Sequence, residues 1–139
     1  RIAAVEAKVA RTDTRPRVFF QIGISPIVSA GSDTFIHELI VKAGGRNIAG
    51  KYTSYPRFSQ EEVLELAPEV ILITSMARHE IFERVKAKWE KWERIPAVSK
   101  NRIHLIDSNL VDRPTPRLVE GLERLTRLIH PELFETEAK

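Results

Sequence analysis

Four short apolar runs alternate with helical patterns along this 139-residue chain, and the alternation constrains the fold more than any other feature. The runs are rich in β-branched and aromatic residues, which favour buried strands, whereas the segments between them repeat apolar residues at helical spacing. The expected strands lie at residues 18–22, 47–49, 70–74 and 103–106. Strands that alternate with helices predict a parallel sheet covered on both faces. We therefore expect an α/β, three-layer αβα fold with a mostly parallel, Rossmann-like sheet of about four strands.

Capping signals locate the helices between these strands. The expected helices run over about residues 33–43, 59–67, 78–94 and 115–130. Asp33 is predicted to cap the first helix, and Ser59 begins the second with Glu62 as the other half of a capping box. Trp92 is expected on the apolar side of the third helix. The chain also opens on a helical apolar pattern, which a linker at residues 12–17 interrupts.

Composition and motif content exclude several kinds of chemistry. The sequence has no cysteine, which removes thiol catalysis, cysteine-ligated zinc and disulfides. Its net charge of +3 arises from 22 basic and 19 acidic residues without a single-sign block, so we expect no nucleic-acid partner. It lacks a P-loop, a dinucleotide fingerprint and a nucleophile elbow, and its four histidines lack ligand-like spacing. We therefore predict neither an enzyme nor a metal site.

The apolar runs are too short to span a membrane, and no export signal is visible at the start of the chain.

Long strand-to-helix loops indicate where a ligand would bind. These loops are expected at residues 23–32, 50–58 and 107–115. In parallel α/β sheets such loops gather at the carboxyl edge of the strands, which is where ligands bind. The second loop contains Tyr55 and Pro56, which offer a flat, partly apolar surface. Tyr55 either contacts a ligand or packs back onto the sheet, whereas Phe58 fits a hydrophobic staple and is predicted to be structural.

Two charged residues in or beside these loops are candidates for binding. Arg113 stands before a proline-stiffened turn, where its guanidinium either offers a fork of donors to a ligand oxygen or pairs with Asp112. Glu61 lies in the first turn of a helix, and the capping box leaves its side chain outward. That carboxylate is either solvated or free for an arginine of a partner protein.

Five segments in this order and spacing resemble a known family, the helical-backbone substrate-binding proteins of bacterial ABC importers for vitamin B12, iron–siderophores and haem. They are Val18-Phe-Phe-Gln-Ile-Gly, Ala43-Gly-Gly-Arg-Asn-Ile, Ser59-Gln-Glu-Glu-Val-Leu-Glu-Leu-Ala-Pro-Glu-Val-Ile-Leu-Ile, Trp92-Glu-Arg-Ile-Pro-Ala-Val and Arg113-Pro-Thr-Pro-Arg-Leu-Val-Glu-Gly-Leu. The resemblance covers the carboxyl-terminal lobe of a two-lobed protein. It implies that residues 1–16 are the end of the interdomain helix with a linker, and that residues 17–139 form the lobe.

The resemblance assigns roles to individual residues. In the family each lobe presents a carboxylate to arginines of the permease, and the matching residue is Glu61. In the vitamin B12 binders, to which this sequence is most similar, aromatic residues face the corrin. Tyr55 stands where those proteins have tryptophan, and Val28 where they have phenylalanine. Asn109, in place of an aspartate, and Arg113 match polar ligand contacts, and Pro56 beside Tyr55 joins this ligand-binding group.

The resemblance therefore implies a non-enzymatic protein that captures a corrinoid, such as cobalamin, between two lobes and delivers it to a membrane permease. It implies a periplasmic or extracytoplasmic location, with lipoprotein anchoring as one mode, and no covalently bound cofactor. Haem or a ferric siderophore is the main alternative ligand, with Tyr52 or Tyr55 as an iron ligand. An α/β enzyme domain and a protein–protein interaction module are the alternatives from other classes.

Overall fold

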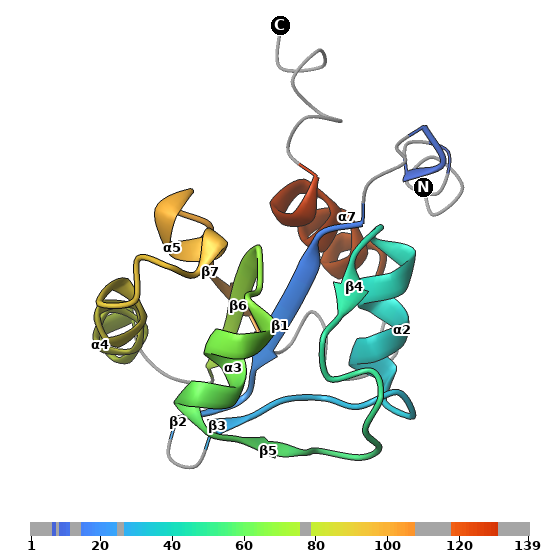
Figure 1. The fold of residues 1–139 in the computed structure, drawn as a ribbon. Helices are drawn as coiled ribbons and strands as arrows, with labels where there is room; N and C mark the ends of the chain where they lie inside the picture. The colour runs from blue at the N-terminus through green and yellow to red at the C-terminus, as the bar shows by residue number, and fades with distance from the viewer. Residues whose placement is uncertain are drawn as a thin grey trace, which may run out of the picture.

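A four-stranded parallel sheet forms the centre of the computed structural model (Figure 1). The structure describes residues 7, 9–11, 15–24, 27–75, 79–107 and 118–130. The strands pair in the order β4-β1-β6-β7, all in parallel, which confirms the predicted sheet. Their bounds are β1 Arg17–Gln21, β4 Arg46–Asn47, β6 Val70–Ser75 and β7 Ile103–Asp107. Only the first residue of the predicted strand at 47–49 belongs to β4, because the chain turns at Ile48.

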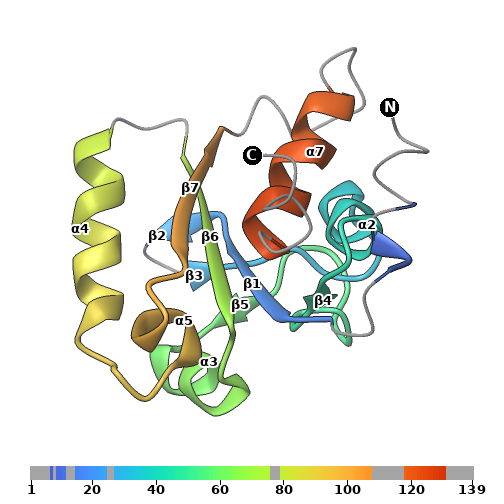
Figure 2. The same cartoon turned by 90° about the horizontal axis from the view of Figure 1, so that it is seen from above.

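Helices cover both faces of this sheet, as predicted. Figure 2 shows α2 (Phe35–Lys42) and α7 (Leu118–Ile129) on one side of the strands. The other side carries α3 (Gln60–Leu66), α4 (His79–Glu90) and the short α5 (Pro96–Ser99). The described part of the molecule is therefore a three-layer αβα lobe. No helix among the described residues is long and apolar enough to cross a membrane.

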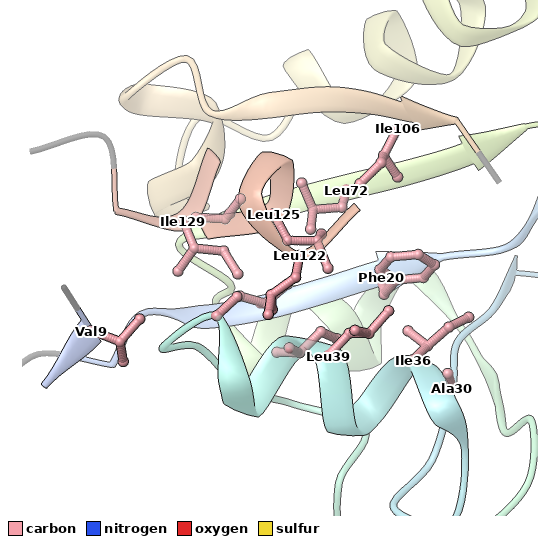
Figure 3. Packing of buried hydrophobic residues seen from close by; sticks show 14 residues of the cluster. Val9, Phe20, Ala30, Ile36, Leu39, Leu72, Ile106, Leu122, Leu125 and Ile129 are labelled. Atoms are coloured by element: carbon pink, nitrogen blue, oxygen red, sulfur yellow. The ribbon is translucent and has the colours of Figure 1, made fainter. Parts of the chain in front are cut away.

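Side-chain alternation along the strands divides the buried residues into two cores. Val18 and Phe20 of β1 point toward α2 and α7, where they pack with Leu125 and other residues drawn in Figure 3. Phe19, between them, points to the opposite face and packs with Val85 and other residues of the second core. Each such fully buried side chain contributes about 1.5–3 kcal/mol relative to an exposed one. Phe19, Phe20 and Val18 are completely buried, so β1 anchors both layers.

The caps of the first two helices follow the sequence with one correction. Thr34, not Asp33, is the N-cap of α2, and its hydroxyl accepts a hydrogen bond from the His37 N–H at 3.2 Å. The Asp33 carboxylate instead accepts from the backbone N–H of Ser54, in the following loop. The capping box of α3 is confirmed, because the Glu62 N–H donates to Ser59 Oγ at 3.1 Å and the Ser59 N–H donates to Glu62 Oε1 at 2.9 Å.

Two further expectations need correction. The third helix does not reach residue 94 but ends at Glu90, and Trp92 lies in the turn that follows, 36% exposed. Ile95 is extended there, as residues before proline usually are, and Pro96 starts α5. The segments expected as loops at 23–32 and 50–58 contain a second sheet. Its antiparallel strands, in the order β2-β3-β5, are β2 Gly23–Ile24, β3 Ile27–Val28 and β5 Arg57–Phe58.

The two ends of the chain are described only in part. Ala7 and Val9 are helical, and Val9 is buried in the core shared with α2 and α7. The domain boundary at residues 16 and 17 stays a prediction. The predicted start of the last helix at residues 115–116 lies outside the described residues, whereas α7 itself is present with Leu122, Leu125 and Ile129 buried.

The pKa of His104, in strand β7, lies below its ordinary value. His104 of β7 is partly buried, and this burial lowers its pKa, with smaller contributions from the positive charges of Arg102 and Lys86. The folded protein therefore binds a proton at His104 less readily than the unfolded chain does. Such a group stabilises the fold above the unfolded-state pKa, and the contribution is lost as the pH falls through the lowered folded-state pKa.

We predict that the free energy of unfolding decreases on acidification from about pH 7 to about pH 5, and that His104→Gln reduces this decrease. The measurement is urea denaturation of both proteins across that pH range. Equal pH dependence in the two proteins would contradict a role for His104.

Candidate functional site

The segments around β3 and β5 form one antiparallel ribbon just past the carboxyl end of β1 (Figure 1). Within the strands, Ile27 pairs with Phe58 and Val28 pairs with Arg57. Backbone hydrogen bonds continue beyond them, from Ser29 N–H to the Pro56 carbonyl at 3.0 Å and from Gly31 N–H to the Ser54 carbonyl at 2.7 Å. A further bond joins Ser32 N–H to the Tyr52 carbonyl at 2.8 Å. We call residues 27–32 and 52–58 the ribbon.

A close approach and a buried amide fix the ribbon in place. A Cβ on Gly31 would lie 2.5 Å from the Tyr52 carbonyl oxygen, so only glycine permits this contact. The buried Asn47 side chain, at the end of β4, donates from Nδ2 to the Ala30 carbonyl at 2.7 Å and to His37 Nδ1 at 3.0 Å. The ribbon is therefore attached to both the parallel sheet and α2.

The two faces of the ribbon have different surroundings. Phe58 is buried and Ile27 packs partly into the core shared with α3 and α4. Strand residues alternate between faces, so Val28 and the directly opposite Arg57 lie on the other face. Tyr55 precedes Arg57 by two residues and lies in a bend just before β5. Val28 is partly buried and Tyr55 is 58% exposed.

The structure separates the roles of the two tyrosines. The Tyr52 ring meets Phe58 edge-to-face at 5.6 Å, and Phe58 in turn meets Phe19 at 5.5 Å. Tyr52 therefore ties the ribbon to the core, and Phe58 is structural, as predicted. Among the described residues, no ring contact or hydrogen bond engages the side chain of Tyr55. Tyr55 is the aromatic residue that this surface leaves available.

Of the remaining predicted ligand residues, the structure describes Pro56 but not Asn109 and Arg113. Pro56 is partly buried, and its carbonyl accepts the ladder hydrogen bond from Ser29. Asn109 and Arg113 follow β7 in the sequence and lie outside the described residues. The structure therefore brings together Val28, Tyr55 and Pro56. Arg57, which the sequence patterns did not single out, is exposed and pairs with Val28; a strand of two residues offers no periodic signal that would have marked it.

Glu61 lies on a different surface, an open groove of about 480 Å³ beside α3. Glu61 and Glu65 are one helical turn apart on the same rim, and both are exposed. Trp92 supplies an apolar wall and Arg94 a positive charge. The residues that line the groove are Glu61, Leu64, Glu65, Ala67, Trp92 and Arg94. This combination of carboxylates and an indole is suited to a protein partner that presents a basic side chain.

Comparison with known proteins assigns the chain to a family. The family model for periplasmic binding protein matches residues 1–110, and the chain belongs to this family. This membership confirms the prediction of a binding protein rather than an enzyme.

Individual relatives align with most of this chain. An uncharacterized ABC transporter substrate-binding lipoprotein of Bacillus subtilis is 31% identical, and the alignment covers 94% of this chain and 40% of that protein. A cobalamin-binding protein of Halobacterium salinarum is 30% identical, covering 94% of this chain and 36% of that protein. The chain thus spans less than half the length of these curated relatives.

Solved structures show the same fold. The periplasmic vitamin B12 binding protein of Vibrio cholerae superposes with a TM-score of 0.79 at 23% identity, over 96% of this chain and 51% of that chain. A periplasmic heme-binding protein of Roseiflexus also superposes with a TM-score of 0.79, at 26% identity, over 95% of this chain and 52% of that chain. The fold is therefore shared by proteins whose names give different ligands.

We predict that Gly31→Ala destabilises the protein by about 1–3 kcal/mol, because the added methyl group forces the Tyr52 carbonyl away and strains the ribbon. Thr53→Ala is the matched control, since Thr53 is exposed in the facing segment, and this substitution should change stability by less than about 0.5 kcal/mol. Chemical denaturation measures both. Equal stability of the two variants would show that the close approach is not a constraint.

Proposed function

We propose that this chain is the ligand-binding lobe of an ABC-importer substrate-binding protein, and that the ligand is a corrinoid such as cobalamin. The observation that carries the proposal is the ribbon itself, which holds the exposed Tyr55 and the partly buried Val28 on a backbone paired by hydrogen bonds. A rigid, partly apolar face is suited to the flat side of a macrocycle, because little conformational entropy is lost on binding.

The names of the relatives support both parts of this proposal. The Bacillus subtilis relative is named as an ABC transporter substrate-binding lipoprotein, and the Halobacterium salinarum relative as a cobalamin-binding protein. Both are more than twice as long as the aligned region. We therefore propose that residues 17–139 act as one lobe of a clamp, with an amino-terminal lobe of the same protein opposite the ribbon. The proposed location is periplasmic or extracytoplasmic, with lipoprotein anchoring as in the Bacillus relative.

Asn109 and Arg113 complete the proposed ligand surface. Both belong to the segment that follows β7, and loops after parallel strands meet at the carboxyl edge, where the ribbon also lies. Their amide and guanidinium groups are suited to hydrogen bonds with peripheral amides of a corrinoid. Tyr55, Val28 and Pro56 supply the apolar part of the same surface.

Haem or a ferric siderophore is the second candidate ligand. The similarity to a heme-binding protein at 26% identity favours it, and so does the phenol of Tyr55, because a tyrosine oxygen can bind ferric iron. Tyr52 is less suited to that role, since its ring is held against Phe58. The two candidate ligands therefore make different demands on Tyr55. A corrinoid requires its aromatic ring, whereas haem or a ferric siderophore requires its phenol oxygen.

For the permease, we propose docking at the groove beside α3 through Glu61. Its carboxylate is exposed on the groove rim, where a permease arginine would meet it together with Glu65 and Trp92. Exposed ion pairs contribute little individually, so the groove adds apolar area to the charge contact. This surface is separate from the outer face of the ribbon.

We predict that the full-length protein binds cyanocobalamin in a calorimetric titration, and that Tyr55→Ala weakens binding about 10- to 100-fold through loss of buried aromatic area. Tyr55→Phe should bind like the wild type, because a corrinoid needs only the ring. Loss of haemin or ferric-siderophore binding in Tyr55→Phe would instead identify an iron ligand. Absence of heat with cyanocobalamin in the wild type would exclude the corrinoid.

We predict that Glu61→Arg abolishes ligand uptake by cells while leaving ligand affinity unchanged, because the reversed charge repels the permease arginines. Glu38→Arg is the matched control, since Glu38 is an exposed glutamate in the first turn of α2, on the other face of the sheet. Uptake of radiolabelled ligand and calorimetry give the two readouts. Loss of both uptake and affinity in Glu61→Arg would count against a docking role.

A further inference from the structure

Arg57 is placed by the ribbon on the surface proposed to face the ligand. It pairs directly with Val28 across the ladder, and it follows Tyr55 by two residues. Its neighbour Phe58 is buried and Arg57 itself is exposed, so the guanidinium belongs to the outer face. Val28 and Arg57 therefore share the outer face, and the exposed Tyr55 lies two residues before Arg57 in the same segment.

The charge of Arg57 is not neutralised within the described part of the chain. No ion pair or side-chain hydrogen bond engages its guanidinium there. Two carboxylates of the adjoining segments have other partners, since Asp33 accepts the Ser54 N–H and Glu62 accepts the Ser59 N–H. Lys51, at the end of the ribbon, adds a second positive charge and sits 5.9 Å from the centre of the Tyr52 ring.

From this placement we infer that Arg57 is a ligand-binding residue, and that it selects a ligand that carries an anionic oxygen group, a carboxylate or a phosphate, at the rim of a flat apolar body. The inference rests on the proposed function, since it assumes that the outer face of the ribbon meets the ligand. A guanidinium presents a planar fork of donors that matches such oxygens in two-point contacts. Arg57 pairs with Val28, and the neighbouring Pro56 carbonyl accepts the Ser29 N–H, so the backbone that carries the guanidinium is held in place before binding.

The chain contains a closely matched control residue. Arg46 and Arg57 are each the first residue of a two-residue strand, and each is exposed and followed by a buried residue. Arg46 pairs with Arg17 at the start of β1, which is the opposite end of the sheet from the ribbon. Replacing either arginine with glutamine changes the net charge of the protein by the same amount. A difference in ligand affinity between the two variants therefore reflects where each arginine lies in the fold.

The test is calorimetry of the full-length protein with cyanocobalamin, which contains a phosphodiester, and with haemin, which contains carboxylates. For the ligand that the wild type binds, Arg57→Gln should lower the affinity about tenfold or more, and Arg46→Gln should leave it unchanged. Arg57→Lys should recover part of the loss, because it restores the charge without the fork. The affinity of the wild type should fall with added salt more steeply than that of Arg57→Gln. Thermal denaturation should show both glutamine variants folded.

Equal affinities of Arg57→Gln and Arg46→Gln would overturn the inference and leave the proposed function standing. Normal affinity combined with reduced uptake in Arg57→Gln would also overturn it, since Arg57 would then belong to the permease contact. Failure of the wild type to bind either probe would overturn the proposed ligand class and this inference together.

Discussion

The backbone ladder between residues 27–32 and 52–58 is the constraint on which the proposed binding surface depends. Each half of the ribbon joins a strand of the parallel sheet to a helix, and each half alone would be an irregular loop. Pairing satisfies their backbone groups on one another, and the contact at Gly31 and the Asn47 amide attach the result to the sheet. Val28, Tyr55 and Arg57 therefore occupy positions set by backbone geometry, which is the precondition for a preformed ligand surface.

The same stretch of chain connects the two proposed surfaces. Phe58 ends the ribbon, packs against Phe19 in the core, and is followed at once by the Ser59 cap of α3. Glu61, in the first turn of that helix, is thus only a few residues from Arg57. The strand, the buried ring and the capping box follow one another directly, so a short ordered segment joins the outer face of the ribbon to the groove beside α3. In the proposed function, a permease bound at the groove would therefore contact the chain only a few residues from the proposed ligand surface.

Local sequence signals predicted the parts of the fold that local interactions decide. The apolar run at residues 70–74 became β6, and the Ser59 and Glu62 pair became a capping box, because each is determined by neighbours within a few residues. Asp33 was misplaced as a cap because Thr34, one residue later, offers an equivalent oxygen, and the Ser54 N–H from a distant loop engages Asp33 instead. The sequence does not predict strands β3 and β5, because a strand of two residues shows no hydrophobic periodicity and because the two strands lie far apart in the sequence.

The sequence predicts that Glu61 faces outward. The groove that Glu61 shares with Trp92 depends on the tertiary structure, so the sequence does not predict it.

Position in the sheet, rather than residue type, separates the candidate functional arginine from its counterpart. Arg46 and Arg57 have the same local pattern, an exposed arginine before a buried residue in a short strand. Arg46 stands at the amino ends of the parallel strands, where β1 and β4 begin, so it has no ligand edge to face. Arg57 stands in the ribbon beyond the carboxyl end of β1, beside Tyr55. In open parallel sheets only the carboxyl edge gathers the loops that hold a ligand. The fold thus supplies the edge, and in the proposed function the side chains on the ribbon supply the chemistry that selects the ligand.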